Sequence, residues 1–140
     1  MSIPETPAHT TTPSPENRRE RFLPLLFGRQ HFLMGELTVY GFMDRLSPRD
    51  YCGGLWTFYE RGGQPLYLAP ASKSRYRLRW EENGYEGEAS AGAAGIIATL
   101  FTFSHLSFRY QSEQLTDGFA RLYEYAAAHP EAGEIFAAID

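Results

Sequence analysis

The pair Asn83–Gly84 constrains the fold of this chain more than any other feature, because it separates two segments with the pattern of β-strands. Asn-Gly is the strongest short-range signal for a two-residue hairpin turn. Before it, residues 74–81 alternate between an apolar set and a basic set, namely Tyr76, Leu78 and Trp80 against Arg75, Arg77 and Arg79. With residues 85–88 as the return strand, this pattern predicts a hairpin with one buried face and one arginine-rich face.

Two further strands are predicted upstream of this hairpin. Residues 55–60 are rich in Trp, Phe, Tyr and Thr, which favour strands. Gly62–Gly63 marks a turn, and residues 65–69 give a second short strand. Because consecutive strands joined by short turns are usually neighbours in a sheet, the four segments together predict a four-stranded antiparallel meander.

Helical periodicity dominates much of the remaining sequence. Residues 30–46 carry an apolar stripe at helical spacing, made up of Leu33, Leu37, Tyr40, Met43 and Leu46. A helix over residues 90–105, with Ser90 as its N-cap, has a broad apolar surface and is predicted to be central. Two more helices are expected, over about 113–128 and from Pro130 onward, so the fold class is α+β.

The N-terminal segment differs from the rest in composition. Residues 1–17 contain four prolines among Thr, Ser and Glu, with too little apolar surface to fold, so they are predicted to form a flexible tail. Residues 18–140 are then expected to form a single domain, in which several helices pack on the sheet. A short first helix in this domain is predicted to end at Pro24.

Cysteine content and hydropathy indicate a cytoplasmic protein. The single cysteine, Cys52, permits no internal disulfide, as expected in a reducing compartment, and no secretory signal pattern is present. Residues 89–108 lack charged side chains over about the length of a membrane span. Their several polar residues favour a buried core helix instead, so no membrane partner is predicted.

Charge is unevenly distributed along the chain, whose net charge is −4. Residues 1–80 hold eleven basic and seven acidic side chains, whereas residues 81–140 hold two basic and ten acidic ones. The arginines at alternate positions of the hairpin could contact phosphates, which makes weak nucleic-acid binding one hypothesis. Glu86 and Glu88 lie across the predicted hairpin, however, and their pairing with Arg77 and Arg79 is the favoured interpretation.

Residues with catalytic potential are sparse. Cys52 with His31 or His105 could form a nucleophile–base pair, which makes a small hydrolase a less favoured alternative. No glycine-rich segment has the spacing of a phosphate-binding loop, and no two histidines are four residues apart. We therefore predict no catalytic residue, no metal site and no cofactor.

Several motifs in order resemble one known family. The segment 51–60 reads YCGGLWTFYE and resembles an aromatic Gly-Gly-x-Trp motif, and the segment 83–90 reads NGYEGEAS and resembles a second hallmark, followed by 93–96. On these residues the chain resembles the ArdB/KlcA antirestriction proteins of plasmids and other mobile genetic elements, over about residues 17–140. This sequence differs from the family pattern at Gly92, where the family is associated with an acidic residue.

This resemblance implies an α+β fold and relief of type I restriction–modification of incoming DNA, through direct or indirect contact with that system. It supplies no catalytic residues. Mimicry of ten base pairs of DNA would need about twenty aligned negative charges, whereas the chain has seventeen acids offset by thirteen bases. The leading hypothesis is therefore a non-enzymatic binding mechanism other than DNA mimicry.

The alternative to this hypothesis is an adaptor that binds DNA or protein through the arginine-rich sheet face. The sequence does not specify an oligomeric state. The candidate interaction residues are those of the arginine face together with two aromatic residues of the motifs and the last residue of the sequence. They are Arg75, Arg77, Arg79, Trp56, Tyr85 and Asp140.

Overall fold

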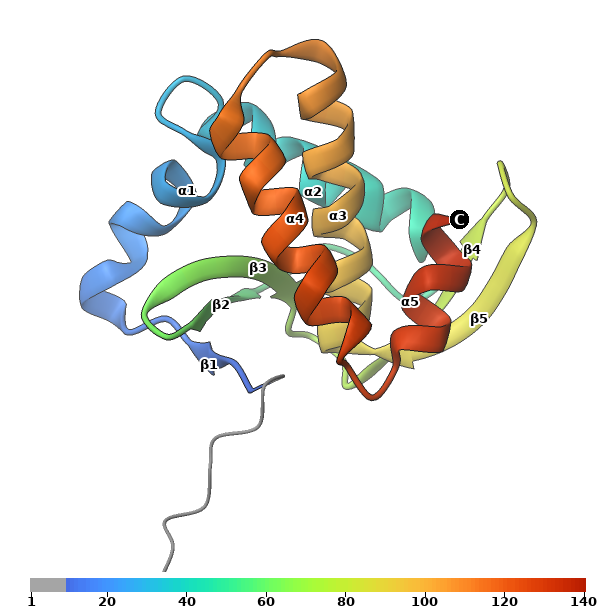
Figure 1. Cartoon of the computed structure of the whole chain (residues 1–140). Coiled ribbons are helices and arrows are strands. Elements are labelled where there is room, and N and C mark those ends of the chain that lie inside the picture. The colour runs from blue at the N-terminus through green and yellow to red at the C-terminus, as the bar shows by residue number, and fades with distance from the viewer. Residues whose placement is uncertain (1–9) are drawn as a thin grey trace, which may run out of the picture.

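The computed structural model describes residues 10–140, which form one α+β domain (Figure 1). The strands are β1 (Thr12–Pro13), β2 (Trp56–Arg61), β3 (Gln64–Pro70), β4 (Arg75–Trp80) and β5 (Tyr85–Ser90). The helices are α1 (Arg19–Phe27), α2 (Phe32–Leu46), α3 (Ala91–Arg109), α4 (Glu113–Ala127) and α5 (Ala132–Ile139), and a short 3₁₀ turn precedes α1 (Glu16–Arg18). The α+β class and the single domain expected from the sequence agree with this arrangement.

The strands form two separate antiparallel sheets, in the orders β1-β2-β3 and β4-β5, so the predicted four-stranded meander is wrong. The two hairpins were placed correctly, but β3 does not pair with β4. The reason lies at the free edge of β3, where Thr99 of α3 contacts the backbone of Leu68. Its Oγ1 lies 3.5 Å from the Leu68 nitrogen and 3.3 Å from the Leu68 oxygen. A helix thus occupies the edge that a fourth strand would need.

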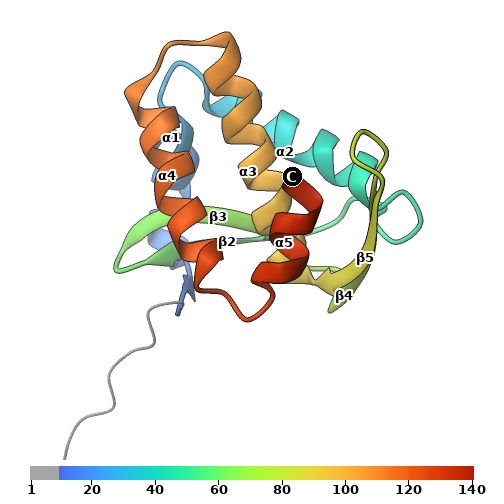
Figure 2. The same cartoon turned by 45° about the vertical axis from the view of Figure 1, so that its right-hand side comes forward.

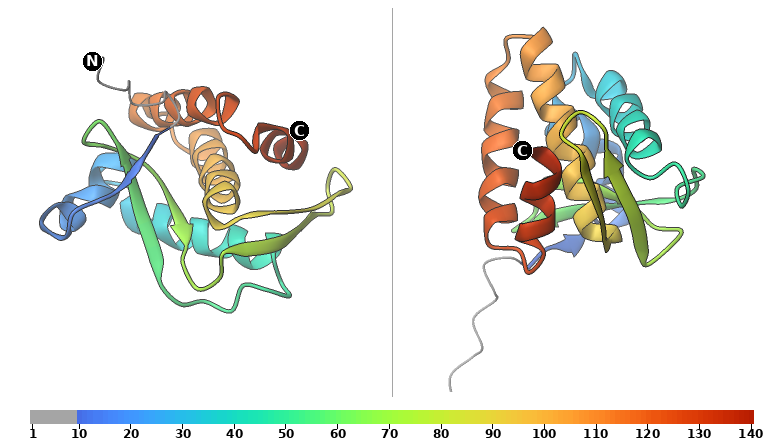
Figure 3. Two further views of the ribbon diagram at one scale, coloured as in Figure 1. Left: turned by 90° about the horizontal axis from the view of Figure 1, so that it is seen from below. Right: turned by 90° about the vertical axis from the view of Figure 1, so that its right-hand side faces the viewer.

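Helix α3 lies at the centre of the domain. Seen from below, it lies between α2 on one side and α4 and α5 on the other (Figure 3, left). Ser90 caps its N-terminus as the sequence predicted, because the Ser90 hydroxyl accepts a hydrogen bond of 3.1 Å from the Ala93 amide. The helix is long and apolar enough to cross a membrane, but most of its apolar window is buried within the domain.

Gly95 allows α3 to approach β3 with no side chain between them. A Cβ atom at this position would lie 2.4 Å from the Cβ of Ala69 and 2.5 Å from the carbonyl oxygen of Leu68. Both distances are too short for any real contact, so only glycine fits while the backbones keep this separation. Thr99 follows four residues later on the same helix face, and the two residues together fix α3 against β3.

Helix α2 buries a different face from the stripe that its sequence suggested. Its buried residues are Gly35, Val39, Met43 and Leu46. Gly35 faces the ring of Phe27 in α1 so closely that a Cβ atom would lie 2.5 Å from a ring carbon. Because the face that carries Gly35 packs inward, Leu33 and Leu37 face outward. Met43 and Leu46 lie in the core, as expected for part of the stripe.

The predicted ends of two helices also need correction. Pro24 lies inside α1 rather than at its end, and the helix continues to Phe27, where Gly28 adopts a φ of 94°. Helix α5 begins at Ala132 rather than at Pro130. Ahead of it the chain forms a turn, because the amide of Glu131 donates a 2.9 Å hydrogen bond to Nδ1 of His129.

Part of the predicted N-terminal tail contacts the domain. Thr12 and Pro13 form β1 and pair with Glu60 and Tyr59 of β2. The pairing relies on main-chain groups, such as the 2.7 Å hydrogen bond from the Ser14 amide to Phe58 oxygen, which a composition-based prediction does not detect. Residues 1–9 of the predicted tail lie outside the described residues.

We predict that Gly95→Ala destabilises the protein by about 1–3 kcal/mol, because the added methyl group overpacks the contact between α3 and β3. Gly41→Ala in α2 is the matched control, since a Cβ atom there has nothing within 4 Å. This control should leave the free energy of unfolding unchanged or raise it by up to about 1 kcal/mol. Urea denaturation measures both, and equal stability of G95A and wild type would contradict the assigned contact.

Candidate functional site

The arginine face of the β4–β5 hairpin is neutralised by carboxylates of the same chain. Arg75 pairs with Glu88 at 2.7 Å, Arg77 with Asp50 at 2.9 Å and Arg79 with Glu81 at 2.6 Å. The hairpin register places Arg77 opposite Glu88 and Arg79 opposite Glu86, yet neither arginine forms an ion pair with the residue opposite. The predicted partners of Arg77 and Arg79 are therefore wrong. Carboxylates of the same chain nevertheless neutralise the face, in line with the favoured interpretation of the sequence.

Asp50 is the most extensively bonded of these carboxylates. Its side chain, only 11% exposed, accepts hydrogen bonds from the Arg77 amide at 2.8 Å and from Arg77 Nε at 3.0 Å, and it pairs with Lys73 at 3.3 Å. The hydrogen bonds from Arg77 hold the pKa of this carboxyl well below its usual range. Asp50 thereby fixes the loop between α2 and β2 against β4, so Arg77 has a structural role.

Trp56 and Tyr85, two of the predicted interaction residues, are buried. Trp56 donates from Nε1 to the hydroxyl of Tyr51 at 3.1 Å, and its ring packs on Tyr40 with a centroid distance of 5.0 Å. The Tyr85 hydroxyl donates to the carboxylate of Glu134 in α5. Burial, together with this carboxylate, raises the pKa of Tyr85. Both side chains hold elements together and offer little surface to a partner.

Asp140 is exposed and follows the last turn of α5, close to the tip of the β4–β5 hairpin (Figure 2). The amide of Asn83 in that tip donates to the carbonyl oxygen of Ala138 at 2.8 Å. A side-chain donor thus satisfies one of the unpaired carbonyls at the C-terminal end of the helix. The hairpin turn that the sequence predicted therefore also acts as a cap for α5.

The residues considered for hydrolase chemistry are engaged separately. Cys52 is exposed in the loop before β2, whereas His31 stacks on Tyr110 at 4.4 Å and His105 contacts the ring of Phe42 at 6.0 Å. No hydrogen bond joins Cys52 to either histidine within residues 10–140. In the same residues, no group of three or more His, Cys, Asp or Glu side chains is placed to hold a metal ion.

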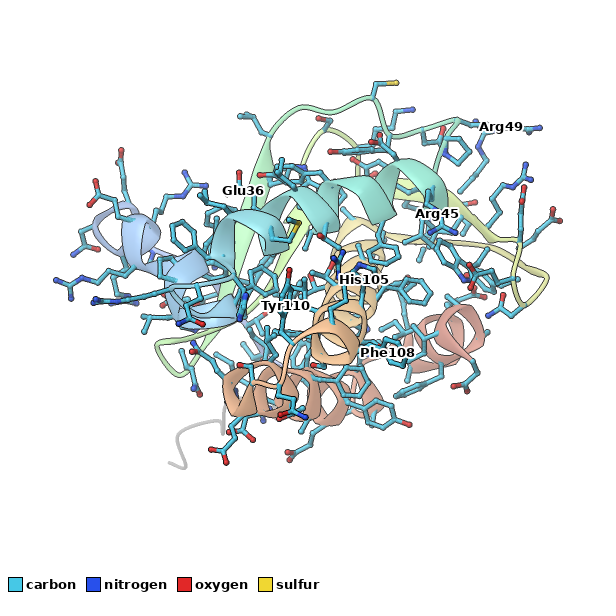
Figure 4. All side chains as sticks on the ribbon, turned by 90° about the horizontal axis from the view of Figure 1, so that it is seen from above. Glu36, Arg45, Arg49, His105, Phe108 and Tyr110 are labelled. Carbon is cyan, nitrogen blue, oxygen red and sulfur yellow. The ribbon has the colours of Figure 1, made fainter. Side chains whose placement is uncertain are left out.

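Exposed apolar side chains gather instead on the outward face of α2. Leu33 is 67% exposed, Leu37 66% and Met34 46%. In Figure 4, α2 crosses the outside of the molecule, with Glu36 and Arg45 marking its two halves. Large apolar side chains this exposed, at helical spacing on one face, are typical of a protein-binding surface rather than of a core-facing stripe.

A pocket of about 670 Å³ lies between α1 and the first residue of α2. It is lined by Glu20, Arg21, Pro24, Leu25, Arg29 and Phe32, and Leu25 is 56% exposed. Arg21 and Arg29 form no ion pair with a carboxylate among the described residues, so their charge is available at the rim. We refer to Leu25, Leu33, Met34 and Leu37 with Arg21 and Arg29 as the α1–α2 surface.

Sequence reasoning missed this surface because Leu33 and Leu37 fit the apolar stripe of α2. The signal that identifies it is Gly35, which can share a face with Val39 and Met43 at intervals of four residues. Gly92, the departure from the family pattern, lies in the first turn of α3. A Cβ atom there would lie 3.7 Å from the Tyr67 hydroxyl, so the position has room for a side chain.

We predict that Asp50→Asn lowers the melting temperature at pH 7, while Glu88→Gln, the removal of an exposed partner of Arg75, changes it little. The folded pKa of Asp50 lies below its unfolded value of about 4. Its carboxylate therefore stabilises the fold above that value, and this contribution is lost as the pH falls toward the folded pKa.

Thermal unfolding followed by circular dichroism between pH 7 and pH 3 tests this prediction. The difference between D50N and wild type should narrow as the pH drops below about 4. If D50N melts with wild type at pH 7, Asp50 does not anchor the loop to β4.

Comparison with known proteins gives consistent results. The family model described as antirestriction protein matches residues 49–140. Antirestriction protein KlcA of Escherichia coli is 40% identical over 131 residues, which cover 89% of each chain. The putative antirestriction protein YubI of E. coli K12 is 34% identical over 131 residues, covering 87% of this chain and 89% of YubI.

A solved structure supports the same relationship. It comes from work on the KlcA and ArdB proteins, which describes a novel fold and antirestriction activity against type I DNA restriction systems in vivo but not in vitro. That structure matches with a TM-score of 0.80 and 39% identity over 100% of both chains. The chain therefore belongs to the antirestriction protein family that includes KlcA and ArdB.

Proposed function

We propose that this protein acts in the cytoplasm to relieve type I restriction of incoming DNA, without enzymatic activity, by binding a protein of the restricting cell. We infer the biological role from membership of the antirestriction protein family. The binding mechanism is inferred from the exposed leucines of α2, since removal of apolar surface from water is the dominant favourable contribution to most protein–protein association.

The behaviour described for KlcA and ArdB supports a requirement for a cellular partner. Those proteins act against type I systems in vivo but not in vitro. A direct inhibitor of the restriction enzyme would be expected to act in both settings, whereas a protein that works through another cellular component would act only where that component is present. We extend this reasoning to the present chain, for which contact with the restriction system is then indirect or depends on a further component.

Charge supports a mechanism other than DNA mimicry. The seventeen acids of the chain are offset by thirteen bases. Several of the carboxylates are also paired within the fold, as Asp50 is with Arg77 and Glu60 with Arg18. A mimic of duplex DNA needs its negative charges free and aligned, at a density of about one per 1.7 Å of helix axis.

Two alternatives gain less support. An adaptor reading DNA through the arginine face would have to break the pairs of Arg75, Arg77 and Arg79 with their carboxylates. A hydrolase built on Cys52 would need a base within hydrogen-bond reach, and His31 and His105 have other contacts. Non-enzymatic binding through the α1–α2 surface remains the proposal that the contacts favour.

The chemistry of the α1–α2 surface specifies its partner. Leu33 and Leu37 are exposed on α2, and Arg21 and Arg29, which form no ion pair among the described residues, line the pocket on α1 together with Glu20. We therefore expect a protein segment with apolar side chains flanked by carboxylates, such as an acidic amphipathic helix.

We predict that the double variant Leu33→Ser/Leu37→Ser loses antirestriction activity. Loss of two apolar anchors should weaken an interface by about 2 kcal/mol or more, which corresponds to roughly a 30-fold change in affinity. Plating efficiency of unmodified phage on a type I restricting host measures the effect. Wild type should raise it, and the variant should return it toward the value with an empty vector.

Leu55→Ser is the matched control, because Leu55 is 80% exposed, lies in the loop before β2 and is not one of the residues of the α1–α2 surface. It should retain activity, and circular dichroism should show all variants folded. Two results would count against the proposal in different ways. Unchanged plating with wild type across several type I systems contradicts the function, whereas full activity of folded L33S/L37S contradicts the surface.

A further inference from the structure

A second pocket lies at the turn end of the β2–β3 hairpin, beside α4. Its volume is about 360 Å³, and it is lined by Arg61, Gly62, Gln64, Pro65, Leu66, Arg121 and Glu124. Arg61 is the last residue of β2, and Arg121 lies in the middle of α4. The pocket shares no residue with the α1–α2 surface or with the arginine face of β4.

The two arginines of this pocket differ from those of β4 in having no carboxylate partner. Neither Arg61 nor Arg121 forms an ion pair within the part of the chain that the structure describes. Both side chains are nevertheless partly buried, and Arg61 lies 5.8 Å from the centroid of the Tyr125 ring. Packing therefore holds these two cations at the pocket, although no internal ion pair compensates them.

Arg121 carries a direct sign of an unmet interaction. Its Nε atom is buried and has no hydrogen-bond partner. A buried charged donor without a partner is costly and rare in folded proteins. Because Nε is enclosed, only the outer nitrogens of the Arg121 guanidinium are left to contact a ligand in the pocket that Arg121 lines.

We infer that this pocket binds a phosphate group. Guanidinium groups recognise phosphate oxygens through paired hydrogen bonds, and two of them can share the oxygens of a single phosphate. Gln64 adds an amide donor at the rim, and Gly62 has no side chain to obstruct the approach of a ligand. Glu124 is the one carboxylate lining the pocket, so a net positive charge remains to attract an anion.

The source of the phosphate is either the backbone of a nucleic acid or a free nucleotide. Two probes separate them: a fluorescein-labelled single-stranded oligonucleotide, followed by anisotropy, and adenosine triphosphate, followed by calorimetry. Binding of the oligonucleotide alone assigns the site to a nucleic-acid backbone. Binding of both probes assigns it to phosphate groups irrespective of source.

Arg61→Gln/Arg121→Gln should weaken binding of the retained probe about tenfold or more at low salt. For the single-stranded oligonucleotide, the magnitude of the slope of log affinity against log salt concentration should fall by about 0.7 for each arginine removed. Arg75→Gln/Arg79→Gln is the matched control, since it changes net charge equally but removes arginines that already have carboxylate partners. It should weaken binding by less than about twofold.

Glu124→Gln tests the same site in the opposite direction and leaves both arginines in place. Removal of the opposing carboxylate should strengthen binding several-fold. Either of two results overturns the assignment: no binding of any phosphate probe to the wild-type chain at low salt, or equal loss in the two double-arginine variants. The inference stands or falls independently of the α1–α2 surface, because neither test involves antirestriction activity.

Discussion

The direct contact between α3 and β3 is the constraint on which the rest of the fold depends. Gly95 brings the helix backbone against Ala69 and Leu68, and Thr99 bonds to the free edge of β3. With that edge occupied, β4 and β5 pair only with each other and form a separate hairpin beside α5 (Figure 1). The central helix can then be covered by α2, α4 and α5 on its remaining faces.

The same arrangement determines which charges are left for partners. The β4–β5 hairpin lies beside the loop after α2, so that Asp50 reaches Arg77 and the arginine face is compensated internally. Among the described residues, the arginines without an ion pair include those of the α1–α2 surface and those of the pocket of Arg61 and Arg121. The first lies beside exposed leucines, as a protein partner requires, whereas the second has the features of an anion site.

Local patterns in the sequence predicted local structure well. The β4–β5 hairpin, the N-cap at Ser90 and the class of the fold depend on neighbouring residues, and the structure confirms them. The predicted two-residue turn at Asn83–Gly84 is wrong in its length, because Trp80 pairs with Tyr85 and the loop spans residues 81–84. The errors involve contacts between distant segments. The absence of β3–β4 pairing depends on Thr99, and the orientation of α2 depends on the contact between Gly35 and Phe27. The spacing of apolar residues along the sequence does not reveal either contact.

Prediction of the candidate site failed for the same physical reason. Trp56 and Tyr85 are conspicuous in the sequence, but hydrogen bonds to Tyr51 and Glu134 place them inside the fold. The exposed leucines of α2 belong to the apolar stripe that the sequence showed, and a stripe at helical spacing normally faces inward. Gly35, at intervals of four residues from Val39 and Met43, was the local sign that a different face of the helix could pack inward.

Site-specific photocrosslinking in living cells tests the central claim most directly. A photoreactive amino acid replaces Leu37 in one variant and Leu55 in the other, both in a type I restricting host, and adducts are identified by mass spectrometry. The account predicts that position 37 gives a defined adduct with a host protein whose contacting segment is acidic and apolar, and that position 55 does not. No adduct at position 37 in a variant that retains antirestriction activity, or the same adduct from both positions, would contradict it.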